Sequence, residues 1–135
     1  MNFKKCRLVS SSLRKLEYDY NPVEGPVNMQ IKTGANAKVP IGDLSKPCIV
    51  EQMIEITAEN GSMNLKCIAV FFFKVDGTGE DYDVEELRNY VLENGNPIAY
   101  KKMTEIVKSV TGFSNQNPLV LPTYQTVSKS KDESN

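Results

Sequence analysis

Two stretches of alternating apolar and polar residues occupy the middle of the chain. From 48 to 59 the even positions are mostly apolar, and the odd positions include Glu51, Glu55 and Glu59. From 63 to 75 the odd positions are almost all apolar. A period of two is typical of a strand with one buried face. Because Asn60 and Gly61 tolerate the positive φ of a tight turn, the pattern predicts an antiparallel hairpin.

The second of these strands is apolar on both faces in its later half. Its even positions there are Ile68, Val70 and Phe72, and Met53 of the first strand is expected beside them. An antiparallel strand in a small sheet needs only one buried face. The additional apolar residues therefore predict an apolar surface on the second face of the sheet. Contact between copies of the chain, peptide binding and burial under the protein's own loops remain open as its use.

Patterning before and after the hairpin completes the expected fold. A long, bulged strand is expected within 3–18 and a strand at 27–33, whereas 34–47 is expected to be a loop or a poorly paired strand end. Helical spacing predicts one helix at 82–93 and a second at 98–111, with Asn96 as N-cap, Pro97 in the first turn and Gly112 as C-cap. The expected class is α+β: a four-stranded antiparallel sheet with one long or broken helix on one face. A single domain at 1–127 and a disordered polar tail at 128–135 are expected.

The amino-acid composition indicates little about the function. The chain has 135 residues, 40% hydrophobic and 24% charged, with a net charge of −1. These values fit one soluble domain and give no electrostatic reason to expect nucleic acid. The longest apolar run, 68–73, is too short to cross a bilayer, and the chain opens without a signal-peptide pattern. We therefore expect a cytoplasmic protein without membrane insertion.

Side chains that carry chemistry are sparse. There is no histidine, and Cys6, Cys48 and Cys67 lack metal-binding spacing, so they are expected to be small buried thiols in a reducing compartment. Glu51 and Glu55 would lie about 13 Å apart along a strand, too far for paired acid catalysis. The loop at 76–79 lacks the lysine and glycine spacing of a phosphate-binding loop. The sequence predicts no enzyme, no metal and no cofactor.

Four motifs carry a resemblance to a known family. They are the hairpin around Asn60, Gly-Asn-Pro-Ile-Ala-Tyr at 95–100, Thr-Gly-Phe at 111–113, and Pro-Leu-Val-Leu-Pro-Thr-Tyr at 118–124. In this order, from 48 to 124, the chain resembles the SecB family of export chaperones. The resemblance implies protomers with a four-stranded sheet and a long helix that assemble as homodimers or homotetramers.

The resemblance also implies an ATP-independent chaperone, or holdase, for unfolded or extended polypeptide clients. The apolar residues expected to contact the client or a sister subunit are Met53, Ile68, Val70, Phe72, Phe113, Leu119, Leu121 and Tyr124. We expect Phe72→Asp to impair assembly, client binding or both. The sequence does not divide these residues between the two roles.

Two departures from the family bear on the export role. Typical members carry acidic residues on the sheet that dock the translocation motor, whereas residues 12–16 here are basic and neutral. The family also usually has a second helix after the position matching Tyr124. Both departures weigh against an export role, and the sequence leaves open whether a translocation motor is engaged. Two alternatives therefore stay open: a chaperone with one dedicated partner, as in toxin–antitoxin systems, and a homo-oligomeric structural or adaptor protein.

Overall fold

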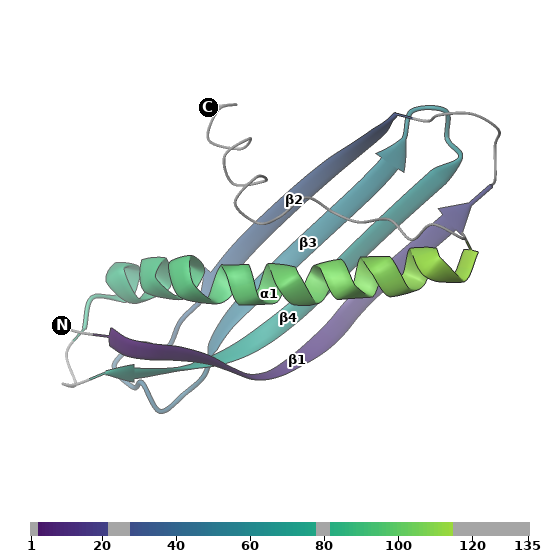
Figure 1. Cartoon of the computed structure of the whole chain (residues 1–135). Coiled ribbons are helices and arrows are strands. Elements are labelled where there is room, and N and C mark those ends of the chain that lie inside the picture. Colours follow the sequence, from purple (N-terminus) through teal and green to yellow (C-terminus); the bar gives the residue numbers. More distant parts are fainter. Residues whose placement is uncertain (1–2, 22–27, 78–81, 115–135) are drawn as a thin grey trace.

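The computed structural model of the chain describes residues 3–21, 28–77 and 82–114. It contains one antiparallel sheet and one long helix that crosses a single face of the sheet (Figure 1). The elements are β1 (Phe3–Tyr20), β2 (Met29–Lys38), β3 (Cys48–Ala58), β4 (Met63–Gly77) and α1 (Val84–Ser114). The strands lie in the order β1-β4-β3-β2, so β1 and β2 are the edges. This confirms the predicted α+β fold.

The predicted hairpin joins β3 to β4. Its register runs without a break from Cys48 opposite Phe73 to Thr57 opposite Asn64. Gly61 has a φ of 75°, a left-handed conformation that glycine adopts without a Cβ clash. The Asn60 side-chain oxygen accepts a hydrogen bond of 3.0 Å from the backbone N–H of Ser62. Turn chemistry and alternating strands therefore agree, which explains why the sequence predicted this element.

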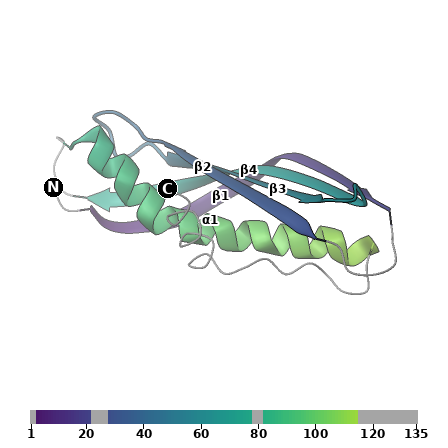
Figure 2. The same cartoon turned by 90° about the horizontal axis from the view of Figure 1, so that it is seen from above.

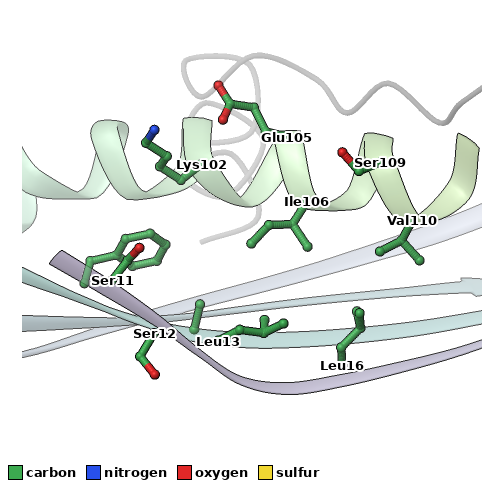
Figure 3. Close-up of a pocket in the computed structure, with 11 residues that line it drawn as sticks. Ser11, Ser12, Leu13, Leu16, Lys102, Glu105, Ile106, Ser109 and Val110 are labelled. Atoms are coloured by element: carbon green, nitrogen blue, oxygen red, sulfur yellow. The ribbon is translucent and has the colours of Figure 1, made fainter.

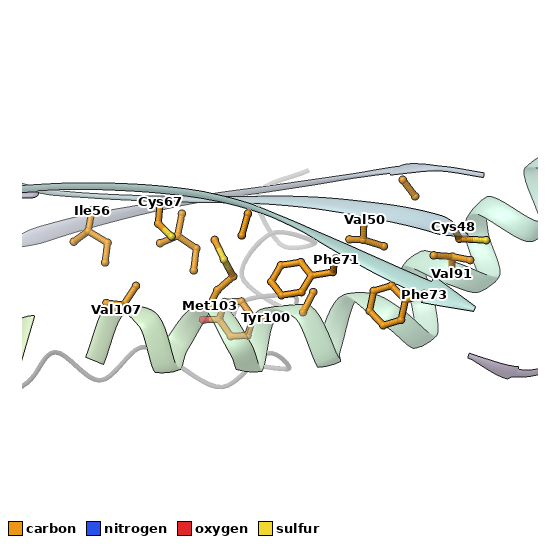
Figure 4. Close-up of a cluster of buried hydrophobic side chains, with 14 of the residues drawn as sticks. Cys48, Val50, Ile56, Cys67, Phe71, Phe73, Val91, Tyr100, Met103 and Val107 are labelled. Carbon is orange, nitrogen blue, oxygen red and sulfur yellow. The ribbon is translucent and has the colours of Figure 1, made fainter. Parts of the chain in front are cut away.

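The core lies between α1 and one face of the sheet. Even-numbered residues of β3 and odd-numbered residues of β4 point toward α1 and are buried. Figure 4 shows side chains of both strands packed against Val91, Met103 and Val107 of the helix. Phe71 and Phe73 are the largest of these fully buried side chains. The opposite side of the sheet, here called the open face, has no described element packed on it (Figure 2).

The first strand is bulged, as its loose pattern predicted. Its pairing with β4 shifts between Phe3 and Lys5, between Leu8 and Ser10, and between Leu13 and Lys15. Each bulge adds a residue that has no partner on β4 and locally increases the twist. After each bulge, the residues that face the helix change from odd to even positions or back. A simple period of two therefore could not predict which side chains of β1 lie on which face of the sheet.

Part of the region expected to be a loop is a strand. Residues 34–38 continue β2 and pair with β3, from Gly34 opposite Met53 to Lys38 opposite Ile49. The expectation of a loop or a poorly paired strand end rested on glycine and proline content. Positions 34–38 are instead a regularly paired strand end, because pairing with β3 overrides weak local preference. Ala37, fully inside the core, closes this end of the sheet beneath α1.

The helical region is one helix rather than two. Pro97 lies inside α1, so the predicted break with Asn96 as N-cap was wrong, and Gly112 also lies within the helix. A proline within a helix removes one hydrogen bond and bends the axis, and α1 changes direction partway along its length (Figure 2). Gln52 of β3 donates a side-chain hydrogen bond of 3.0 Å to the Asn96 carbonyl. Contacts with the sheet thus stabilise a continuous helix although Pro97 locally disfavours it.

Candidate functional site

The helix leaves apolar side chains of both edge strands exposed on the face that it covers. On β1 these are Leu13, which is 49% exposed, and Leu16, which is 40% exposed. On β2 they are Met29 at 40% and Ile31 at 39%. Their cross-strand partners, including Ala69, Cys67, Ala58 and Ile56, are buried. The core therefore continues outward to an apolar flank on each side of the sheet. We call these the β1 flank (Leu13 and Leu16) and the β2 flank (Met29 and Ile31).

The β1 flank forms one wall of a groove. This groove lies between β1 and the C-terminal half of α1 and has a volume of about 470 Å³ (Figure 3). Ile106 and Val110 of the helix face Leu13 and Leu16 across it. Phe71 of β4 also lines the groove. Lys102, Glu105 and Ser109 supply the polar edge along the helix. An apolar floor with a polar margin suits a packed apolar side chain from another chain.

The two edge strands differ in regularity. β2 pairs with β3 at ten consecutive positions with no shift, so its outer edge is a regular row of backbone donors and acceptors. β1 has three register shifts, and bulges of this kind hinder addition of another strand at an edge. Among the described strands, β2 therefore offers the better template for an added extended chain.

Four of the predicted site residues share the open face. Ile68, Val70 and Phe72 alternate along β4, and Met53 lies opposite Ile68, as the sequence predicted. Ile49, opposite Phe72, belongs to the same group and was missed because it precedes the clear alternation of β3. Val70 is 6% exposed, and the other four are half-buried. We call these five residues the open-face patch.

The remaining predicted site residues are not brought to this patch. Phe113 lies in the last turn of α1, and its side-chain position is not described. Leu119, Leu121 and Tyr124 lie outside the described residues, as does the predicted tail at 128–135. The residues that sequence reasoning missed are Leu13, Leu16 and the exposed β2 pair. Met29 and Ile31 did alternate with polar residues, but their exposure depends on where the helix crosses.

The three cysteines are free thiols; Cys48 and Cys67 are buried, as predicted, whereas Cys6 is only half-buried. The described residues contain no cluster of acidic, cysteine or histidine side chains able to hold a metal ion. The described part of the chain also has no helix of the length and hydropathy needed to span a membrane.

The buried thiol of Cys48 predicts a loss of stability at alkaline pH. Burial, and secondarily the nearby Cys6, raises the pKa of Cys48 from 9.0 to about 11. Between these values the unfolded chain loses the proton while the folded chain keeps it, so the free energy of unfolding falls as pH rises. Urea midpoints measured below pH 9.0 and near pH 11 should show this fall. Cys48→Ala should make the fall shallower, and an unchanged slope in that variant would contradict the assignment.

A four-stranded antiparallel sheet crossed by one long helix is the fold of SecB-like chaperones. The SecB-like chaperone of Mycobacterium tuberculosis, solved with a ChAD peptide from an antitoxin, matches with a TM-score of 0.73 and 15% identity. That match covers 87% of this chain and 88% of the other. A protein of unknown function from Streptococcus agalactiae matches with a TM-score of 0.45 and 8% identity, over 90% and 99% of the two chains. No protein-family model matches, and no curated protein gives a significant match.

Proposed function

We propose that this protein is an ATP-independent chaperone that binds extended segments of unfolded polypeptide. The observation that carries the proposal is the pair of apolar flanks, where four large side chains of the edge strands remain 39–49% exposed. The two flanks lie on opposite edges of the sheet, and within each flank the two exposed apolar side chains are neighbours on one strand face. Neighbouring exposed apolar side chains of this kind indicate an interaction surface. The chaperone of the same fold that was solved with an antitoxin peptide supports this use of the scaffold.

The client binds at the β2 flank in this proposal. The unbroken register of β2 leaves a regular outer edge, and a client strand can form main-chain hydrogen bonds there whatever its sequence. Met29 and Ile31 lie on the same strand and offer apolar contact to alternate client side chains. Burial of apolar client surface contributes roughly 25 cal/mol per Å² removed from water.

A second copy of the chain binds at the β1 flank. The groove between β1 and α1 has defined walls, including Leu16 and Ile106, and so favours one complementary partner. The bulges make β1 a poor template for arbitrary strands. Homodimers or homotetramers built at this flank leave the β2 flank free for clients. This division places assembly and client binding on residues other than the open-face residues expected from the sequence, so Phe72→Asp is no longer expected to impair either.

A single light-scattering experiment tests both parts. Purified protein is measured alone, and then with a reduced, unfolded model protein whose aggregation is followed. We expect a dimer or tetramer that suppresses aggregation at near-stoichiometric ratio, and a Leu13→Asp/Leu16→Asp variant with the mass of a smaller species. A stable oligomer that leaves client aggregation unchanged would contradict the chaperone proposal. A variant of unchanged mass would contradict assembly at the β1 flank.

The breadth of clients distinguishes a general chaperone from one with a dedicated partner. The peptide bound by the chaperone of Mycobacterium tuberculosis comes from an antitoxin, which makes a dedicated role a specific second candidate for this chain. Affinities for several unrelated unfolded proteins decide between them. Similar weak affinities indicate a general holdase, whereas binding confined to one sequence indicates a dedicated chaperone.

A further inference from the structure

Positive charge surrounds one end of the open-face patch. Arg7 lies directly opposite Lys74 on the strand rows beyond Phe72, and Lys38 lies opposite Ile49 on the other side. Arg14, the residue added by the third bulge, lines the same hollow as Lys38. Among the described residues the ion pairs are Lys15–Glu17 and Arg88–Glu85. The four cations Arg7, Arg14, Lys38 and Lys74 therefore have no carboxylate partner there.

This arrangement costs the isolated protein stability. Like charges directly opposite each other on neighbouring strands repel, as Arg7 and Lys74 do. The chain as a whole has a net charge of −1, so the cationic end is a local concentration and not a general property. A carboxylate from another molecule would relieve the repulsion at this site.

The hollow at this end combines charge with apolar walls. It has a volume of about 450 Å³ and is lined by Arg14, Asn36, Lys38, Ile49, Glu51 and Val70.

Farther along the sheet, one row of residues crosses all four strands with charges of alternating sign, and we call this row the charge ladder. Its members are Glu17, Lys66, Glu55 and Lys32. The ladder carries no net charge, whereas at the Phe72 end the cations Arg7, Arg14, Lys38 and Lys74 outnumber the nearby carboxylates Glu51 and Asp76.

We propose that the open-face patch docks an acidic, apolar segment of a partner protein. Its carboxylates pair with Arg14 and Lys38, while its apolar side chains contact Phe72 and Ile49. Glu51 within the hollow and the apolar centre disfavour a nucleic acid backbone, which needs a continuous basic surface. A second copy placed patch on patch would bring together the cations that surround both patches. The docked partner is therefore a different protein, and this surface is separate from the two flanks.

Matched synthetic peptides test the proposal with the full-length protein. One peptide alternates glutamate with phenylalanine and isoleucine, a second replaces glutamate with lysine, and a third replaces the apolar residues with serine. We expect only the first to bind well, with an affinity that falls at high salt. Zero-length cross-linking joins carboxylates to amines, so it should attach this peptide to Lys38 and Lys74. Cross-links confined to other lysines would overturn the placement.

Charge-reversed variants provide the control. Arg14→Glu/Lys38→Glu should weaken the acidic peptide at least about tenfold, and Phe72→Asp should weaken it as well. Lys101→Glu/Lys108→Glu makes the same change in net charge on exposed positions of α1 and should leave binding nearly unchanged. Equal losses in both double variants, or equal binding of the lysine peptide, would overturn the proposal. A changed oligomer mass in Arg14→Glu/Lys38→Glu would show instead that the face joins copies of the chain.

The test is independent of client binding at the β2 flank. A Met29→Asp/Ile31→Asp variant should lose unfolded clients and keep the acidic peptide, because these residues point to the helix side of the sheet. Loss of both ligands in that variant would mean that the peptide occupies the client site, and the open-face proposal would then fail.

Discussion

Replacing Met29 and Ile31 together with aspartate lowers the affinity for an unfolded client about 100-fold, while the oligomer keeps its mass. Each wild-type side chain is about two-fifths exposed, so a bound client can bury further apolar area. The variant loses that transfer free energy and also places two carboxylates in a contact that excludes water. A combined loss of about 2.7 kcal/mol corresponds to the 100-fold change. Fluorescence anisotropy of a labelled, reduced client measures it.

Gln30→Asp is the matched control for this experiment. Gln30 lies between the two residues on the same strand but pairs with Thr57 on the open face. A carboxylate there changes the charge of β2 without entering the β2 flank. If Gln30→Asp reduces client binding as much as the double variant does, the client is held by something other than the flank.

Gly95→Leu lowers the free energy of unfolding by about 3 kcal/mol. A Cβ at this position would lie 3.2 Å from the Cε2 and Cζ atoms of Phe73. The Phe73 ring is completely buried between sheet and helix and has little room to move. A leucine therefore forces α1 away from β4 along the middle of the core. Urea or thermal unfolding followed by circular dichroism measures the loss.

Two further substitutions serve as controls for the loss of stability expected of Gly95→Leu. Gly95→Ala adds only the Cβ, and its compression against Phe73 is offset by about 1 kcal/mol of improved helix propensity, so we expect a change near zero. Asn94→Leu adds a similar side chain at an exposed neighbouring position, with an expected change within about 0.5 kcal/mol. A Gly95→Leu protein as stable as Asn94→Leu would show that the helix–sheet distance is not set by this contact.

The central hairpin was predictable because local and tertiary requirements coincide there. Alternation along β3 and β4 matches the burial of one face, and Gly61 has the conformation that the turn needs. The open-face patch was predictable for the same reason, since alternation alone assigns Ile68, Val70 and Phe72 to one side. The pattern could not say what occupies that side, because no property of the strand itself specifies a partner.

The errors came from contacts between segments distant in the sequence. Pro97 was taken as a helix start, yet α1 continues through it because Gly95 packs on Phe73 and the Asn96 carbonyl accepts a hydrogen bond from Gln52. The later part of β2 was read as a loop or a poorly paired strand end, because local sequence does not reveal its regular pairing with β3. The flanks were missed because exposure of Leu16 depends on the path of the helix over the sheet.

The charge ladder has a consequence for how the long first strand finds its place. The bulges of β1 make its alignment with β4 ambiguous, because an extra residue can be absorbed at more than one point. Moving β1 by two residues in one direction would set Lys15 opposite Lys66, two like charges on adjacent strands. The native alignment sets Glu17 opposite Lys66 instead. The charge ladder thus destabilises one incorrect register of β1 relative to the native register while the chain folds.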